Sequence, residues 1–249
     1  MSPSPLLKIS GLYKNFGGVQ AIDDLNFEIA EGELLGMIGP NGSGKTTAVN
    51  LITGFVKPSE GEIFYHGQNI TGRAPYKIVR LGIARTFQMV KPFYQLPAYK
   101  NMIIPLYSPR VKKMSGGKYG DRDAVALDLL EEVGFERDSH VAYKPASVLP
   151  QGYLKRLELA KALALNADLI ILDELFSGLS LAEVASIMPI IEKLRQEGKS
   201  IIMIEHRLKE LFRIADRVIV LNFGEKIADG KAADVMESDA VKNAYLGSE

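Results

Sequence analysis

Short apolar runs separated by turn residues fill the first part of the chain. Such runs are typical of strands when glycine or aspartate pairs interrupt them, as Gly17-Gly18 and Asp23-Asp24 do here. The pattern predicts small strands joined by turns. They lie at residues 6–9, 19–22, 25–29, 34–38 and 61–67.

The middle of the chain has a helical pattern instead. Prolines break the segment from about residue 92 into short pieces, and Ser115-Gly116-Gly117 marks a flexible basic loop. Apolar residues then recur at helical spacing over 124–133, where we expect Asp123 to cap the helix. The same spacing returns over 152–165. We therefore expect a helical insertion over roughly 92–165.

An alternation of strand and helix resumes after this insertion. Residues 168–172 and 200–204 are expected as strands of the kind that parallel sheets bury, because each contains a run of four apolar residues, and a helix is expected between them at 182–196. A further strand is expected at 217–221, and 226–228 is a candidate to pair beside it. The whole pattern predicts an α/β core interrupted by a helical insertion.

The composition is that of an ordinary globular protein. Of the 249 residues, 47% are apolar and 24% are charged. Thirty basic residues balance thirty acidic ones, so no global field attracts nucleic acid or an anionic membrane surface. The sequence has no cysteine, which excludes disulfides and thiolate metal sites and fits a reducing cytosol.

No stretch has the features of a secretory or membrane-spanning segment. The residues Met1-Ser2-Pro3-Ser4-Pro5 lack the positive charge and apolar core of a signal peptide. The longest apolar runs are far shorter than the ~20 residues that a spanning helix needs. We expect a cytoplasmic protein whose membrane role, if it has one, comes through a partner.

One glycine-rich stretch carries the first chemical signal. Gly39-Pro40-Asn41-Gly42-Ser43-Gly44-Lys45-Thr46-Thr47 fits the G-x-x-x-x-G-K-[ST] pattern and follows the apolar run 34–38, as the pattern requires. Its glycines let backbone N–H groups point inward, and the positive end of the next helix adds to this cradle for a polyphosphate. Lys45 is expected to reach the β and γ phosphates and Thr46 to hold Mg²⁺. The alternative is a glycine-rich turn that matches by chance.

A pair of carboxylates, Asp173-Glu174, ends the apolar run Ile170-Ile171-Leu172. The C-terminal edge of a parallel sheet is where such folds bind ligands, and strand alternation points the two side chains to different sides. We expect Asp173 to hold the Mg²⁺ shell and Glu174 to act as base or water-positioner. Without the phosphate-binding loop, two surface charges would be the favoured interpretation.

These motifs, in this order, resemble those of the nucleotide-binding subunit of ATP-binding cassette transporters, over nearly the whole chain. Phe16, in Tyr13-Lys14-Asn15-Phe16-Gly17-Gly18, matches the aromatic residue that stacks on adenine, a contact worth ~1–3 kcal/mol. Gln88 matches the glutamine that joins the core to the helical lobe and meets Mg²⁺ or the attacking water. His206 matches the histidine that donates to the γ phosphate and orients Glu174.

The resemblance also implies the fold and the ligands. It implies a P-loop NTPase with a RecA-like parallel sheet, an antiparallel β subdomain and an inserted helical subdomain, in one ABC ATPase domain over 1–249. The nucleotide-binding core would comprise 1–91 and 166–249, and the helical signature subdomain 92–165. ATP and Mg²⁺ are the implied ligands. The residues expected to bind ATP are Phe16, Gly39, Asn41, Gly42, Ser43, Gly44, Lys45, Thr46 and Thr47; those toward the metal are Thr46, Gln88 and Asp173; the catalytic ones are Lys45, Gln88, Glu174 and His206.

The chain departs from the family in its signature segment. The family's Leu-Ser-Gly-Gly-Gln falls here on Leu149-Pro150-Gln151-Gly152-Tyr153. In the family this segment closes over ATP bound to the other subunit, and its serine hydroxyl touches the γ phosphate. Pro150 has neither a hydroxyl nor an N–H, although proline suits a helix start. We expect a weakened clamp, with Gly152 and the positive end of the helix still able to face the phosphate.

A second departure follows the two carboxylates. The family commonly ends a Ser-Ala-Leu-Asp run with an aspartate that helps the subunits communicate, whereas this chain has Ser177-Gly178-Leu179-Ser180. Ordinary family variation is one interpretation. The other is an asymmetric pair, in which Lys45, Asp173 and Glu174 work against a partner's signature while this chain's own signature closes a slower site.

Within the family, three stretches resemble the ATPase subunits of branched-chain amino acid importers. They are Gly82-Ile83-Ala84-Arg85-Thr86-Phe87-Gln88, Phe16-Gly17-Gly18 and Ala244-Tyr245-Leu246-Gly247. The implied partners are a second ABC subunit, transmembrane permease subunits and, indirectly, a solute-binding protein, with no nucleic acid, at the inner face of the cell membrane. Two alternatives stay open: an ABC ATPase without a transport role, and a nucleotide-dependent regulator with weak hydrolysis.

Overall fold

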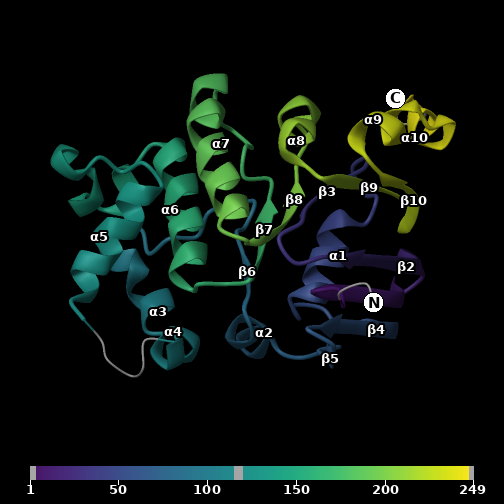
Figure 1. Ribbon diagram of the computed structural model, residues 1–249, viewed down its shortest axis with the longest axis horizontal. Coiled ribbons are helices and arrows are strands. Elements are labelled where there is room, and N and C mark those ends of the chain that lie inside the picture. The colour runs from purple at the N-terminus through teal and green to yellow at the C-terminus, as the bar shows by residue number, and fades with distance from the viewer. Residues whose placement is uncertain (1–3, 115–119, 247–249) are drawn as a thin grey trace. The chain divides into compact units, whose positions relative to one another are not determined.

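The computed structural model describes residues 4–114 and 120–246 of the chain (Figure 1). The expected loop Ser115-Gly116-Gly117 and the final residues from Gly247 lie outside these described residues. The chain forms two compact units, one made of Met1–Ile78 with Gly198–Glu249 and the other of Val79–Glu197. Each unit is described by itself.

The first unit contains an antiparallel sheet with the strand order β2-β1-β4-β5. Apolar and polar residues alternate along its strands, so that Leu7 and Ile9 are buried while Lys8 is exposed. The turn Gly17-Gly18 joins the first two strands, as the sequence predicts. The strands are β1 (Leu7–Phe16), β2 (Val19–Ile29), β4 (Glu60–Tyr65) and β5 (Gln68–Asn69).

A second group of strands in the same unit is centred on β3, which pairs in parallel with β8 on one side and β9 on the other. All the residues of β3 and β8 are buried, which explains their continuous apolar runs. The expected pairing of 226–228 is confirmed, because β10 lies antiparallel to β9. The strands are β3 (Leu34–Ile38), β8 (Ser200–Ile204), β9 (Arg217–Asn222) and β10 (Glu225–Gly230).

Among the described residues, four helices belong wholly to this unit, and a fifth crosses its boundary. They are α1 (Lys45–Ile52), α8 (Leu208–Ile214), α9 (Ala232–Glu237) and α10 (Asp239–Leu246), with α2 (Pro75–Leu81) at the boundary. The helices α9 and α10 form the yellow end of the chain in Figure 1.

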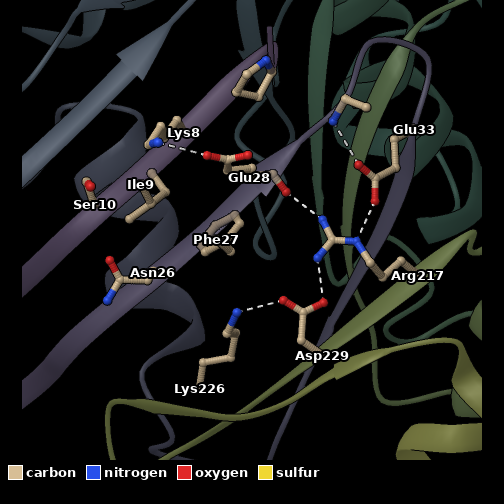
Figure 2. A pocket seen from close by; sticks show the side chains of 12 residues that line it. Lys8, Ile9, Ser10, Asn26, Phe27, Glu28, Glu33, Arg217, Lys226 and Asp229 are labelled. Carbon is tan, nitrogen blue, oxygen red and sulfur yellow. Dashed lines mark hydrogen bonds and ion pairs between the residues drawn. The ribbon is translucent and has the colours of Figure 1, made fainter. Parts of the chain in front are cut away.

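An ion-pair network around Arg217 ties β2, β9 and β10 together (Figure 2). The guanidinium of Arg217 donates to Glu33 at 2.8 Å, to Asp229 and to the carbonyl of Glu28, and Lys226 reaches Asp229 at 2.6 Å. Burial alone would raise the pKa of Asp229, but the hydrogen bonds from Lys226 and Arg217 outweigh it and lower that pKa below its usual range. These charges line a cavity of about 580 Å³ and pair with one another, so the cavity is not the candidate functional site.

The second unit contains the parallel strand pair β6 (Ile83–Arg85) and β7 (Leu169–Asp173), with a set of helices. The helix α5 packs against α6 (Figure 1). The helices are α3 (Ile103–Leu106), α4 (Pro109–Met114), α5 (Arg122–Glu132), α6 (Gln151–Ala164) and α7 (Leu181–Gln196), and the 3-10 turns are η1 (Tyr99–Met102), η2 (Arg137–Ser139), η3 (Val141–Tyr143) and η4 (Ala146–Val148).

One helix start differs from the prediction. The N-cap of α5 is Asp121, whose carboxylate accepts hydrogen bonds from the N–H groups of Asp123 and Ala124 at 3.0 and 3.2 Å. The expected cap, Asp123, lies inside the first turn and pairs with Lys100. The prediction was wrong because either aspartate can cap a helix, and the backbone turns at the earlier one.

The predicted α/β fold class, with an antiparallel sheet and a helical part, agrees with this architecture. The expected helical insertion 92–165 lies within the second unit, and its boundaries stay a prediction. Among the described residues, no helix combines the length and the apolar character needed to cross a membrane.

Candidate functional site

The glycine-rich loop 39–44 joins β3 to α1 in the first unit, and its backbone conformation requires glycine. Gly39, Gly42 and Gly44 have φ angles of 148°, 78° and 106°. A Cβ atom on Gly39 would lie 2.1 Å from the carbonyl oxygen of Leu221, and one on Gly44 would lie 2.8 Å from that of Ala21. The loop is therefore wedged against the backbones of β9 and β2 and has little freedom to change shape.

Lys45 folds back over this loop. Its Nζ donates hydrogen bonds to the carbonyl oxygens of Gly39 and Pro40 at 2.7 and 2.8 Å, and its side chain is buried. Phosphate oxygens would compete with these two carbonyls for the same ammonium. The lysine is thus held within the loop, at the place where the sequence pattern expects it to meet a phosphate.

The first turn of α1 gives the loop its other polar groups. The first N–H groups of a helix have no partner within the helix and attract anions. Among the expected ligands here, Asn41, Gly42 and Thr46 are exposed and Thr47 is half-buried. Ser43 is buried, and its carbonyl accepts a hydrogen bond from the N–H of Gly224 at 3.0 Å. The loop therefore presents an open, polar face with a fixed base.

Phe16 ends β1 at the Gly17-Gly18 turn and is 49% exposed. The Nζ of Lys14 lies 4.8 Å from the centre of its ring. The hairpin places β2 beside the loop, because a Cβ atom on Gly44 would also lie 3.0 Å from Cδ1 of Ile22. An exposed ring at the end of this hairpin can stack on a planar base.

His206 follows β8 and is exposed. Parallel pairing sets Ile204 of β8 opposite Met37 of β3. The same register carried two residues further leads from Met37 to Gly39 and from Ile204 to His206. Within the first unit, His206 therefore belongs to the strand end next to the phosphate-binding loop.

The C-terminal helix α10 also contacts this loop, which sequence reasoning missed. Ala240, Asn243 and Ala244 line a cavity of about 390 Å³ together with loop residues 40–43. Burial raises the pKa of the Tyr245 hydroxyl, and a hydrogen bond from the N–H of Gly39 offsets part of that rise. Tyr245 is thus hydrogen-bonded to Gly39, the residue that begins the loop.

In the second unit, Asp173 ends β7 and is buried against Arg85 of β6. The Nη2 of Arg85 lies 2.6 Å from Oδ2 of Asp173, and the N–H of Asp173 donates to the Thr86 hydroxyl at 3.2 Å. Sequence reasoning gave Arg85 no role of its own. The parallel pairing of Arg85 with Ile171 brings the two charges to the same end of the strand pair.

Glu174 leaves the strand in a left-handed backbone conformation with a φ angle of 49°. This conformation costs a non-glycine residue roughly 1–2 kcal/mol. The Oε2 of Glu174 accepts a hydrogen bond from Nε2 of Gln88 at 2.6 Å. The structure therefore brings together the glutamate and the glutamine that the sequence predicts to act on one water.

A third residue, Lys155 of α6, joins this pair. Its Nζ donates to the carbonyl oxygens of Gln88 and Glu174 at 2.8 and 2.9 Å, and its side chain is only 1% exposed. The sequence offered no signal for it, because a lysine on an amphipathic helix is usually at the surface.

The signature segment 149–153 leads into α6. Leu149 is buried, Pro150 is the N-cap and Gln151 is exposed. The ring of Tyr153 meets that of Phe135 edge to face, with centroids 5.0 Å apart. A Cβ atom on Gly152 would lie 2.4 Å from Oε1 of Glu183, so this glycine makes room for a carboxylate.

Ser180, the residue where the family commonly has aspartate, is the N-cap of α7. It forms a capping box with Glu183, whose Oε2 accepts from the N–H and the hydroxyl of Ser180 at 2.8 Å each. These two hydrogen bonds lower the pKa of Glu183. One carboxylate thus lies between Ser180, which replaces the family's aspartate, and Gly152, a signature residue that matches the family: Oε2 accepts from Ser180 and Oε1 faces Gly152.

The predicted site residues therefore fall into two groups. The phosphate-binding loop, Phe16 and His206 belong to the first unit, and Gln88, Asp173, Glu174 and the signature segment belong to the second. The family described as "ABC transporter" matches residues 22–177, a span of more than half the chain that includes the loop and both carboxylates. The chain belongs to the ATP-binding cassette (ABC) transporter family.

Curated relatives extend the similarity of this ABC protein to nearly its full length. It is 34% identical to the high-affinity branched-chain amino acid transport ATP-binding protein BraF of Pseudomonas aeruginosa, over 98% of both chains. It is 33% identical to the high-affinity branched-chain amino acid transport ATP-binding protein LivG of Escherichia coli K12, again over 98% of both chains. The resemblance to this branch of the family is confirmed.

Solved structures agree. A nucleotide-free ATP-binding cassette from an ABC transporter has a TM-score of 0.86 and 28% identity, covering 97% of this chain and 99% of that one. The ADP conformation of the ATP-binding cassette MJ1267 has a TM-score of 0.85 and 29% identity, covering 98% of this chain and 100% of that one. A dimeric post-hydrolysis cassette bound to ADP and Pi has a TM-score of 0.80 and 28% identity, covering 91% and 98%. The predicted fold class is confirmed, and the protein is a nucleotide-binding ABC ATPase.

Proposed function

We propose that this ABC ATPase powers the import of branched-chain or related amino acids. The observation that carries the proposal is the alignment, over 98% of both chains, with ATP-binding proteins of branched-chain amino acid transport. The solute itself would not touch this subunit, so the proposal concerns the transport system that it serves.

ATP binding would use groups of the first unit. Phe16 would stack on adenine through its exposed ring. The N–H groups of the loop and of α1 would hold the phosphates, and Lys45 would exchange its bonds to Gly39 and Pro40 for phosphate oxygens. His206 would donate to the γ phosphate.

Mg²⁺ suits the remaining predicted ligands, which all offer oxygen atoms. Magnesium commonly binds proteins through one or two carboxylates plus substrate phosphates. Asp173 contacts Arg85 through Oδ2 at 2.6 Å, so Oδ1 is not used in that contact. Gln88 donates to Glu174 through Nε2, so its amide oxygen is not used in that hydrogen bond. With Thr46, these groups would hold the ion, which would neutralise charge on the phosphates.

Hydrolysis would depend on Glu174. The carboxylate would accept a proton from the attacking water or orient that water in line with the γ phosphate. Gln88 would sense the same water, and the hydrogen bond from its amide to Glu174 supports this role. Catalysis of this kind is mostly positioning and charge stabilisation.

The partners would be a second cassette, transmembrane permease subunits and, through them, a solute-binding protein. We place the subunit at the inner face of the cell membrane. Around η1 and α3, in the expected helical subdomain 92–165, several large apolar side chains are exposed and would suit a permease contact. They are Phe93, Tyr94, Leu96, Ile103 and Ile104.

One observation favours a second candidate, a nucleotide-dependent regulator with weak hydrolysis. Pro150 supplies no hydroxyl at the N-cap of α6, and no side-chain cap is present there. In the asymmetric pair, hydrolysis is weak only at the site that this chain's own signature closes. ATP turnover by this chain alone, and mixed with a second cassette, separates them: stimulation by the second cassette supports asymmetry, and full activity alone contradicts it.

Reconstitution tests the transport function. The subunit, purified with the membrane proteins that bind it, is placed in liposomes with ATP on its side. We expect uptake of labelled leucine that requires ATP and the matching solute-binding protein, with urea as the comparison solute. Failure to co-purify with any membrane protein would favour an ABC ATPase without a transport role.

A further inference from the structure

Lys155 is a buried charge that the assigned mechanism does not use. It lies on α6 shortly after the signature segment and is among the largest fully buried side chains of the described residues. Burying an ammonium is costly unless hydrogen bonds compensate, and here Nζ donates to two backbone carbonyls at 2.8 and 2.9 Å.

The two carbonyls belong to the two residues that would face the attacking water. They are those of Gln88 and Glu174, whose side chains are joined by a further hydrogen bond of 2.6 Å. The backbone and the side chains of this pair are therefore fixed relative to each other through one ammonium group. Because the two residues are 86 positions apart in the chain, local structure alone cannot hold them together.

The backbone of Glu174 needs such support. Its φ angle of 49° is a left-handed conformation that persists in a non-glycine residue only when the surroundings enforce it. The hydrogen bond from Lys155 acts on the carbonyl of this same residue. Releasing that carbonyl would let the peptide relax and swing the carboxylate away.

We propose that Lys155 is a positioning residue for ATP hydrolysis, which fixes the backbone carbonyls of Gln88 and Glu174 and so places both side chains against the attacking water. The inference rests on the proposed role of Glu174. In this proposal, α6 carries the signature segment at its start and, one turn later, the lysine that supports Glu174 of the same subunit. A shift of this helix would therefore move both the signature segment and Glu174.

The test compares steady-state ATP hydrolysis by Lys155→Met, Lys155→Arg and the wild type. Removing the ammonium leaves nucleotide contacts intact but misplaces the water, so kcat should fall about a hundredfold while KM and the affinity for ADP stay unchanged. Arginine can donate to both carbonyls and should restore most of kcat. The matched control is Lys193→Met, an exposed lysine of α7, which should leave kcat unchanged.

A double-mutant cycle identifies the residue through which Lys155 acts. In a Glu174→Gln background, adding Lys155→Met should lower the residual kcat by much less than about a hundredfold, because one of the two groups being placed is already gone. A lysine with a general structural role would lower it by the full factor again. If Lys155→Met does not fold, Lys155→Gln keeps an amide donor and should show a reduced kcat with unchanged ADP affinity.

Three results would overturn the inference: wild-type kcat in Lys155→Met, a loss confined to KM or ADP affinity, or no recovery with arginine. The proposed function fails in a different way. An inactive wild type, or a Glu174→Gln variant with full turnover, would contradict the assignment of Glu174, whereas loss in Glu174→Gln with full activity in Lys155→Met contradicts only the role of Lys155.

Discussion

The Nη2 of Arg85 lies 2.6 Å from Oδ2 of Asp173, and the two side chains are only 8% and 4% exposed. Removing one partner of a buried pair leaves the other charge uncompensated, which typically costs about 3–5 kcal/mol. We expect Arg85→Met to lower the free energy of unfolding by that amount in urea titrations.

The exposed pair between Arg137 and Asp128 provides the control, since its side chains are 56% and 61% exposed. Arg137→Met should cost no more than about 1 kcal/mol. Equal effects of the two substitutions would show that Arg85 does not serve to neutralise Asp173.

Gly39 fixes the base of the phosphate-binding loop. An alanine there would put its Cβ 2.1 Å from the carbonyl oxygen of Leu221, which belongs to the backbone of β9 and cannot rotate away. We expect Gly39→Ala to weaken ATP binding at least about tenfold, because a loss of 1.4 kcal/mol corresponds to that factor. Equilibrium binding of a fluorescent ATP analogue measures it.

Gly230→Ala is the matched control in the same unit, because its added Cβ would meet only Val235 at 3.7 Å. It should bind the analogue as the wild type does. Tight binding by Gly39→Ala would mean that the loop tolerates a different shape from the one described.

Gly152 and Glu183 should be energetically coupled. An alanine at 152 would push Oε1 of Glu183 aside and so break the hydrogen bonds that Oε2 accepts from Ser180. Each single substitution, Gly152→Ala and Glu183→Ala, should destabilise the protein. The double variant should be more stable than the sum of the two effects predicts, by about 0.5–3 kcal/mol. Glu183→Ala removes the carboxylate with which the alanine at 152 would clash, and the capping box can be lost only once. Additive unfolding energies would refute the link.

The network around Arg217 makes stability depend on pH. The pKa of Asp229 is lower in the folded protein than in the unfolded chain, so its stabilisation is complete above the unfolded value of about 3.9 and is lost as the pH falls through the folded value. We expect the unfolding free energy of the wild type to fall more steeply between pH 5 and pH 3 (about a unit either side of that value) than that of Asp229→Asn. Parallel curves for the two proteins would rule out this contribution.

The fold and the phosphate-binding loop could be predicted from the sequence because their signals are local. Continuous apolar runs mark buried parallel strands, and glycines at 39, 42 and 44 sit where the backbone takes positive φ angles. The capping box of α7 was also readable, since Ser180 and Glu183 stand at the required spacing. The comparison with the family, by contrast, identifies Ser180 only as the residue that replaces an aspartate.

The charged contacts of the second unit could not be predicted from the sequence. Arg85 and Asp173 are 88 positions apart, and Lys155 is 67 positions from Gln88. No periodicity relates such distant residues, and arginine and lysine are mostly found at the surface. The cap at Asp121 shows the same limit at short range, because two neighbouring aspartates carry equal signals and only the backbone path chooses between them.

The central claim is that Glu174 places or deprotonates the water that attacks ATP. It is tested most directly by steady-state ATP turnover of Glu174→Gln beside the wild type, with binding of the fluorescent ATP analogue measured on both. General-base catalysis typically contributes 10²–10⁴-fold, so turnover should fall by about that factor while the analogue still binds. Unchanged turnover in Glu174→Gln would contradict the account.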